Sequence, residues 1–285
     1  MVTKRKFGII GGDFRQIHLA NKILKDNNKV FLFGFDKLNY NFPVLNNIYE
    51  LIDKSEYIIL PLPETRDGIH LFSPFSGVTT DFSKKIFNFM QSKIVFGNLK
   101  KFTEYSGGIK FYDYSKTEEF QIMNAVPTAE GAIKIIMEQN GETLLNKNCL
   151  ITGFGRIGKI LANRLKSFGA NITVASRNPT ELAWAEALGY GYMALDDLAY
   201  KIKNYHLVFN TIPSTIFTKE ILSQCQKNIF IIDVASKPGG IDKKEAENFK
   251  INYIHALGIP GKIFPKSAAE IIYNSIRKII EEENL

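Results

Sequence analysis

The clearest chemical signal in the sequence is a glycine pattern of the form G-x-G-x-x-G, made by Gly153-Phe154-Gly155-Arg156-Ile157-Gly158. An apolar run at residues 148–152 precedes it, and residues 157–168 follow with the apolar spacing of a helix. A strand, a glycine turn and a helix in this order are typical of a dinucleotide site, where the backbone and the helix start bind the pyrophosphate. We therefore predict that these six residues bind a dinucleotide. A glycine-rich turn without a nucleotide is the alternative.

The end of the next predicted strand bears on the choice of dinucleotide. An Asp or Glu at this position binds the ribose 2′-hydroxyl of NAD, but the segment here is Ser176-Arg177-Asn178, with no carboxylate in the turn. A guanidinium can bind a phosphate through two hydrogen bonds, so we predict NADP(H) rather than NAD(H). A solvated surface arginine is the alternative reading of Arg177. The loop Thr211-Ile212-Pro213 follows the fourth strand and is predicted to lie along the nicotinamide ribose; an ordinary turn is its alternative.

Three basic residues follow predicted strands and point to an anionic substrate. Arg15 begins a helix after Gly11-Gly12-Asp13, and Lys237 and Lys262 follow the fifth and sixth strands of the nucleotide-binding part. Each is predicted to hold a carboxylate or phosphate, with a plain surface residue as the alternative. His255 is the histidine best placed for proton transfer, although a structural histidine is the more common case. No metal-binding spacing such as HExxH or CxxC occurs, so we expect no metal site.

Strands that alternate with helices must position these residues, and the pattern predicts an α/β protein with two parallel-sheet domains. Residues 127–266 are predicted as a Rossmann-type domain, and residues 1–126 as a smaller α/β domain that the helix at residues 267–285 joins. A helix at residues 128–140, with Thr128 as its N-cap after Pro127, is predicted to cross between the domains beside a cleft. The predicted strands lie at residues 7–10, 30–33, 57–60, 93–96, 148–152, 171–175, 190–194, 207–210, 229–234 and 251–255. The other predicted helices lie at residues 16–25, 157–168, 181–188, 196–203 and 219–224.

The composition limits which cellular compartment and which kinds of partner we expect. The 285 residues carry a net charge of +7, but the excess lysines are scattered and no nucleic-acid motif is present, so we expect no nucleic acid partner. Two cysteines, Cys149 and Cys225, are typical of a reducing compartment. No apolar stretch approaches the roughly 18 residues of a membrane span, and no signal segment is evident. We therefore expect a cytoplasmic protein that does not enter a membrane. We also expect a homo-oligomer, which these features do not by themselves indicate.

Several longer segments carry a family resemblance. They are GGDFRQ (11–16), PTAEGA (127–132), the glycine pattern, ASKPGGID (235–242), ALGIPGK (256–262) and PKSAAE (265–270). In this order they resemble the A subunits of the dipicolinate synthases of spore-forming bacteria. The resemblance implies a flavodoxin-like N-terminal domain and a Rossmann domain, as in 2-hydroxyacid dehydrogenases. It also implies NADP-dependent oxidation of a dihydrodipicolinate-type intermediate to dipicolinate (pyridine-2,6-dicarboxylate) during sporulation, together with the B subunit of dipicolinate synthase.

Under this resemblance the substrate carries two carboxylates, which Arg15, Lys237 and Lys262 would hold, while Glu130 or His255 would accept the proton. Two alternatives stay open. One is another NADP-dependent dehydrogenase, of the shikimate or methylene-tetrahydrofolate type. The other is a regulator that binds NADP(H) without turnover.

Overall fold

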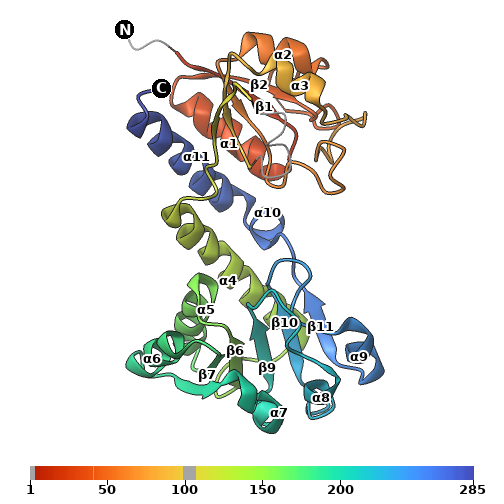
Figure 1. Ribbon diagram of the computed structural model, residues 1–285, viewed down its shortest axis with the longest axis vertical. Helices are drawn as coiled ribbons and strands as arrows, with labels where there is room; N and C mark the ends of the chain where they lie inside the picture. The colour runs from red at the N-terminus through yellow and green to blue at the C-terminus, as the bar shows by residue number, and fades with distance from the viewer. Residues whose placement is uncertain (1–3, 41, 99–106) are drawn as a thin grey trace. The chain divides into compact units, whose positions relative to one another are not determined.

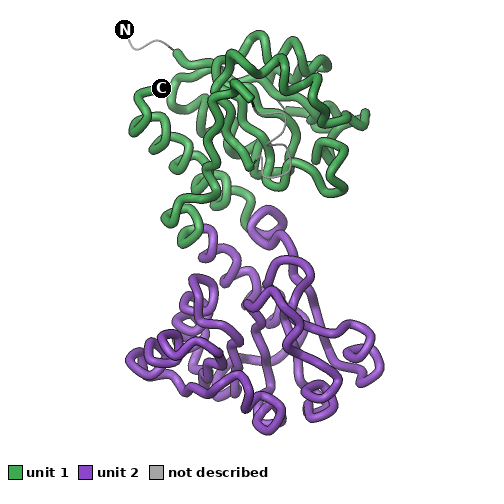
Figure 2. The backbone as a smooth tube through the Cα atoms, in the orientation of Figure 1, with its two compact units in different colours: residues 1–123, 264–285 green, residues 124–263 purple. Residues whose placement is uncertain are grey.

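The computed structural model describes residues 4–40, 42–98 and 107–285. The chain divides into two compact units, one of residues 1–123 and 264–285 and one of residues 124–263 (Figure 2). Each unit contains its own parallel β-sheet with helices against it. The prediction of an α/β protein with two parallel sheets is confirmed.

The first unit is built on a five-stranded sheet. Its strands are β1 (Lys6–Ile10), β2 (Lys29–Phe33), β3 (Tyr57–Ile59), β4 (Ile94–Phe96) and β5 (Lys110–Tyr112). The spatial order β2-β1-β3-β4-β5 is that of flavodoxin-like folds, as expected. Strand β5 was not predicted, because it lies at the sheet edge and its three residues are exposed or half-buried, so they form no apolar run. Ligands of such sheets bind where the strand order reverses, here between the carboxyl ends of β1 and β3.

Helices cover both faces of this sheet. One face packs against α1 (Phe14–Lys25) and the C-terminal helix α11 (Pro265–Glu282), which lie side by side (Figure 1). The other face packs against α2 (Ile48–Lys54) and α3 (Lys84–Phe89). Strands buried on both faces are apolar at every position, which explains runs such as Phe7 to Ile10.

The second unit is built on a six-stranded parallel sheet. Its strands are β6 (Asn148–Thr152), β7 (Asn171–Ser176), β8 (Gly191–Ala194), β9 (Leu207–Asn210), β10 (Phe230–Asp233) and β11 (Asn252–His255). All six were predicted, and their ends agree to within one residue. The order β8-β7-β6-β9-β10-β11 is the 3-2-1-4-5-6 order of the Rossmann fold.

The helices of the second unit were predicted less well. The structure has α5 (Arg156–Ser167), α6 (Pro179–Ala187), α7 (Leu198–Lys201), α8 (Lys219–Leu222), α9 (Lys243–Asn248) and α10 (Ile259–Ile263). The helix expected at residues 196–203 is instead the single turn α7 between two 3-10 turns. Its buried residues Leu195, Leu198 and Ile202 recur every three or four positions, which either helix type satisfies. Helix α9 was missed because only Ala246 is buried, so it has no apolar stripe.

Helix α4 (Glu118–Asn140) corrects a second prediction. We expected it to begin at residue 128, but it begins at Glu118 and contains Pro127. The Thr128 hydroxyl donates to the Asn124 carbonyl at 2.8 Å, inside the helix, and is not an N-cap. A proline in a helix costs roughly 3 kcal/mol. Buried residues on both sides of it, such as Ala125 and Ala129, offset this cost through packing.

Over the described residues, no helix is both long and apolar enough to cross a bilayer.

Candidate functional site

The glycine turn between β6 and α5 is shaped by two close approaches. Gly153 has a φ of +83°, and a Cβ there would lie 2.5 Å from Thr211 Oγ1. A Cβ on Gly158 would lie 2.3 Å from the Gly153 carbonyl oxygen, where α5 packs on the turn. Gly155 is exposed, and a Cβ there would meet nothing within 4 Å. Two glycines therefore build the turn, while the third leaves its outer side open.

The start of α5 has the properties of a phosphate site. Gly155 is its N-cap and has no side chain to cap the helix, and Arg156 and Ile157 form its first turn. A helix start without a side-chain cap presents N–H groups and the positive end of the helix dipole. Together with the open side of Gly155, these groups fit the pyrophosphate of a dinucleotide.

A carboxylate that the sequence analysis missed lies beside this turn. Glu181, in the first turn of α6, accepts hydrogen bonds through Oε2 from Phe154 N at 2.9 Å and from the Ser176 hydroxyl at 2.6 Å. The inference that no carboxylate reaches the turn after β7 is therefore wrong. Asn178 caps α6 through Thr180 N, and this cap followed by proline was the signal that places Glu181 in the first helical turn.

Arg177 directly follows the last residue of β7, and its side chain is exposed to solvent. Within the described ranges its guanidinium makes no ion pair with an acidic side chain. It lines a pocket of about 290 Å³ together with Asp196, Tyr200 and Glu220, among others. A guanidinium without an internal partner can bind an anion from outside.

A buried polar network ties together the ends of β6, β9 and β10. The Thr152 hydroxyl donates to Asn210 Oδ1 at 2.7 Å, and Asn210 Nδ2 donates to Asp233 Oδ1 at 2.8 Å. Asp233 also accepts from the backbone N–H groups of Ala235 and Gly240, at 3.0 and 2.6 Å. All three side chains are fully buried. This network was not predicted, although the polar residues that end three apolar strands were a signal for it in the sequence.

The network fixes the loops that carry predicted site residues. Ile212 N donates to Asn210 Oδ1 at 3.1 Å and the Thr211 hydroxyl donates to the Thr152 carbonyl at 2.9 Å, while Pro213 is exposed. The loop after β10 is held by Asp233, and Lys237 lies exposed in it. The loop after β9 is therefore attached directly to the glycine turn.

His255 is bonded to the loop after β10. Its Nε2 lies 2.9 Å from the Ala235 carbonyl oxygen, which can only accept, so Nε2 carries the hydrogen. In the neutral ring Nδ1 is then an acceptor. Lys262 lies exposed in the last turn of α10.

Glu130 is not gathered with these residues. It lies on α4, and its Oε1 accepts from Arg164 Nε at 3.2 Å. Arg164 is two turns along α5 from Arg156, about 12 Å at 1.5 Å per residue. The structure thus places Glu130 beside the second half of α5, away from the glycine turn.

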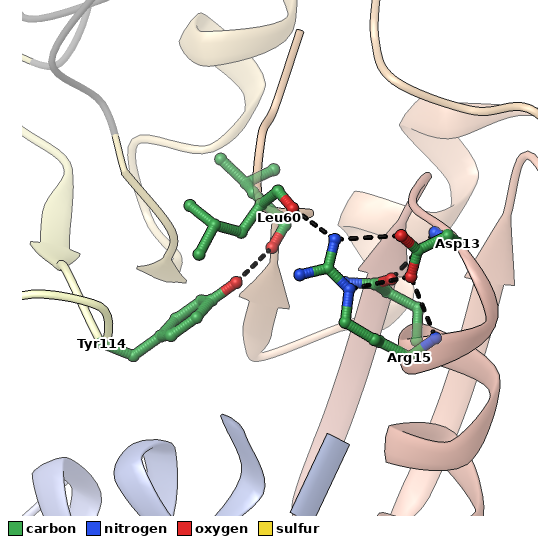
Figure 3. Close-up of polar contacts among 6 residues, drawn as sticks. Asp13, Arg15, Leu60 and Tyr114 are labelled. Atoms are coloured by element: carbon green, nitrogen blue, oxygen red, sulfur yellow. Dashed lines mark hydrogen bonds and ion pairs between the residues drawn. The ribbon is translucent and has the colours of Figure 1, made fainter. Parts of the chain in front are cut away.

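In the first unit, Arg15 lies where the sheet order reverses. Its Nε and Nη2 donate to the two Asp13 carboxylate oxygens at 2.8 and 3.0 Å (Figure 3). Nη2 also donates to the Leu62 carbonyl. The Tyr114 hydroxyl donates to the nearby Leu60 carbonyl, and burial raises the pKa of Tyr114 above its usual range. Arg15 is 12% exposed, and its Nη1 has no hydrogen bond in the described part of the chain.

A buried amide lies next to this arginine. Gln16 Oε1 accepts from Asp13 N at 2.9 Å and completes the cap of α1. Its Nε2 is buried and has no hydrogen-bond partner among the described residues. Buried donors of this kind are rare and call for an explanation, such as a ligand or a bound water.

Both parts of the chain match family models. Residues 6–104 match the N-terminal domain of the dipicolinate synthase A subunit, and residues 128–244 match the NAD binding domain of D-isomer specific 2-hydroxyacid dehydrogenases. The A subunit of dipicolinate synthase from Bacillus subtilis (strain 168) is 30% identical over an alignment of 300 positions, which covers 99% of this chain and 98% of that protein. The chain belongs to the family of dipicolinate synthase A subunits.

Solved structures of this family agree with the assignment. The dipicolinate synthase A subunit from Bacillus halodurans has a TM-score of 0.88 at 26% identity, over 98% of this chain and 99% of that one. The dipicolinate synthase A chain from Bacillus subtilis has a TM-score of 0.87 at 28% identity, over 100% of this chain and 98% of that one. D-lactate dehydrogenase from Escherichia coli shares the fold alone, with a TM-score of 0.64 at 16% identity, over 98% and 97%. The resemblance found in the sequence is confirmed, and the family and the nucleotide-binding domain identify an oxidoreductase.

Proposed function

We propose that this protein catalyses the NADP-dependent oxidation of a dihydrodipicolinate-type intermediate to dipicolinate during sporulation, together with the B subunit of dipicolinate synthase. The observation that carries the proposal is the 30% identity to the Bacillus subtilis protein across 99% of the chain. We place the reaction in the cytoplasm, where Cys149 and Cys225 would stay unpaired as they are in the structure. Burial raises the pKa of both thiols to about 12, which disfavours the reactive thiolate.

The choice of NADP rests on Arg177. Its exposed guanidinium lies at the end of β7, the strand whose last residue meets the adenosine ribose in Rossmann domains. A cation with no ion pair in the described ranges suits the 2′-phosphate, which NAD lacks. Replacing Arg177 with Gln is expected to weaken NADP⁺ binding about tenfold or more and to leave NAD⁺ binding nearly unchanged. Equal or tighter binding of NAD⁺ by the unaltered protein would count against the assignment.

The oxidation removes a hydride and a proton from the substrate ring. A bound nicotinamide would accept the hydride, and the protein's tasks are to orient the substrate and to take the proton. We favour His255 over Glu130 for the proton, because the Ala235 carbonyl holds the His255 ring and leaves Nδ1 as an acceptor. Glu130 is instead engaged by Arg164.

Substrate carboxylates are assigned to basic residues. In the first unit we assign one to Arg15, whose Nη1 and the neighbouring Gln16 Nε2 are donors without partners in the described part of the chain. The Arg15 guanidinium can donate to a carboxylate through Nη1, whereas the neighbouring Gln16 is fully buried. In the second unit, Lys237 and Lys262 are both exposed and are assigned the same task.

The activity is tested with the purified protein, NADP⁺ and freshly generated substrate, with and without the B subunit. Dipicolinate, detected by its ultraviolet absorbance, is expected to form together with NADPH, in equal amounts. Absence of dipicolinate when the B subunit is present would overturn the proposal. Turnover of a shikimate-type or methylene-tetrahydrofolate substrate would indicate another dehydrogenase, and NADP⁺ binding without any turnover would indicate a regulator.

Arg15 is tested in the same assay. Arg15→Gln is expected to raise KM strongly or to abolish turnover, while the Kd for NADPH stays the same. Lys25→Gln, on the exposed side of the same helix α1, is the matched control and should change neither. A melting curve shows whether loss of the Asp13 partner unfolds the first unit. Unchanged kinetics in a folded Arg15→Gln protein would remove Arg15 from the site.

A further inference from the structure

Glu181 reaches the end of a strand to which it does not belong. Ser176 is the last residue of β7, and Glu181 is five positions later, in the first turn of α6. Its Oε2 accepts from the Ser176 hydroxyl at 2.6 Å and from Phe154 N, inside the glycine turn, at 2.9 Å. The carboxylate therefore lies between the strand end and the glycine turn.

This is the place where a Rossmann domain presents its ribose-binding carboxylate. In NAD-dependent members an Asp or Glu at the strand end binds the ribose 2′-hydroxyl. Here Ser176 occupies the strand end, and the following helix supplies the charge in its stead. Only one oxygen of Glu181 is used internally, because Oε1 has no hydrogen bond in the described part of the chain. The side chain is half-buried, so Oε1 can meet a ligand.

We propose that Glu181 is a specificity-determining residue of the dinucleotide site, which accepts a hydrogen bond from the ribose 2′-hydroxyl of NAD(H) and opposes the 2′-phosphate of NADP(H). Two neighbouring charges of opposite sign then set the preference. Arg177 attracts the phosphate, and Glu181 reduces that advantage and keeps NAD(H) binding. The inference rests on the proposed function in one respect, namely that the turn after β7 binds the adenosine ribose.

The test is the ratio of the Kd values for NAD⁺ and NADP⁺, measured by calorimetry on the whole protein. Glu181→Gln removes the charge and keeps the shape, and its amide oxygen can still accept from Ser176 and Phe154. NADP⁺ is expected to bind about five- to tenfold more tightly, the effect of removing one like charge from a partly solvated pair. NAD⁺ should bind equally or slightly less well. Adenosine 2′,5′-bisphosphate and 5′-AMP should repeat the result without the nicotinamide half.

A matched control separates this effect from the change in net charge. Glu186→Gln also removes a carboxylate from α6, where Glu186 is exposed and accepts from the Tyr192 hydroxyl at 2.9 Å. It should leave the ratio of the two Kd values unchanged. The inference would be overturned by a Glu181→Gln protein that melts normally and shows an unchanged ratio, or that binds both ligands equally less well. Glu181 would then only stabilise the turn.

The Arg177→Gln variant distinguishes this failure from failure of the proposed cofactor. If Arg177→Gln weakens NADP⁺ binding while Glu181→Gln leaves the ratio unchanged, NADP dependence stands and the role of Glu181 is overturned. If Glu181→Gln raises the preference for NADP⁺ and Arg177→Gln has no effect, the role of Glu181 stands and the reason given for NADP dependence fails.

Discussion

Gly158 and Gly155 lie three residues apart, and a methyl group would meet very different surroundings at each. At position 158 it would lie 2.3 Å from a backbone oxygen, which cannot move without distorting the turn. We expect Gly158→Ala to destabilise the protein by about 1–3 kcal/mol, as overpacking does, and to weaken dinucleotide binding at least tenfold. Urea unfolding and calorimetry with NADP⁺ measure the two effects.

Gly155→Ala is the matched variant. A Cβ at position 155 meets nothing within 4 Å and the backbone φ of −74° suits alanine, so the stability should change by less than about 1 kcal/mol. Dinucleotide binding should nevertheless fall, because the methyl group occupies the open side of the turn. Unchanged NADP⁺ affinity in this variant would show that the phosphates bind elsewhere.

His70, in the first unit, has a raised pKa because it contacts two carboxylates. Its Nδ1 lies 2.6 Å from Asp67 Oδ2 and its Nε2 lies 3.3 Å from Asp81 Oδ1. The hydrogen bond to Asp67 is the main cause that raises the pKa of His70, and in turn the pKa of Asp67 is well below its usual range. A raised histidine pKa stabilises the folded state below the unfolded pKa of about 6.5, and this contribution is lost as the pH rises through the folded value.

Asp67→Asn tests this pair. The pKa of His70, measured by NMR titration, is expected to fall toward its ordinary value when the Asp67 charge and hydrogen bond are removed. Asp81→Asn should lower it less, because Asp81 is farther away and acts through charge alone. A larger effect of Asp81→Asn would contradict the assignment.

At the scale of elements, the C-terminal helix is part of the core of the first unit. Ile276 of α11 is 2% exposed and belongs to one apolar cluster with Ile17 of α1 and Ile9 of β1. The Tyr273 hydroxyl bonds to Asp26 and Lys22 pairs with Glu270, which join the same two helices at their surface. The last helix in the chain therefore stabilises a sheet formed near its beginning.

Ile276→Ala measures this contribution. Removing a fully buried isoleucine side chain is expected to lower the free energy of unfolding by about 2–4 kcal/mol, through lost burial and the cavity left behind. Arg277→Ala, whose side chain is exposed, should change it by less than about 0.5 kcal/mol. Similar denaturant midpoints for the two variants would show that α11 is not an integral part of the core.

At the scale of the whole molecule, the net charge of +7 acts on every anionic ligand. A dicarboxylate and a dinucleotide are both attracted by it over distances near the Debye length, which falls from about 30 Å at 0.01 M salt to about 8 Å at 0.15 M. We expect the Kd for NADP⁺ and the KM for the substrate to rise several-fold over this range. Uncharged adenosine is the control, and an equal salt effect on it would rule out an electrostatic cause.

Local patterns in the sequence predicted most of the fold. The six strands of the second unit and the glycine turn are predicted correctly. Apolar runs and the glycines Gly153, Gly155 and Gly158 determine the conformation of residues that are close to them in the sequence. The pattern failed where packing outweighs a local preference, as at Pro127 in α4, or where an edge strand is not buried, as in β5.

The sequence by itself determined the family, the two parallel sheets and the glycine turn of the nucleotide-binding domain. Only the tertiary structure decided which polar side chains bind one another. It paired Arg15 with Asp13 and Glu130 with Arg164, and it brought Glu181 back to the end of β7 and Asp233 to Asn210. The physical reason is that apolar periodicity reports which face of an element is buried. The partner of a polar side chain depends on how loops and helix starts fold back in space.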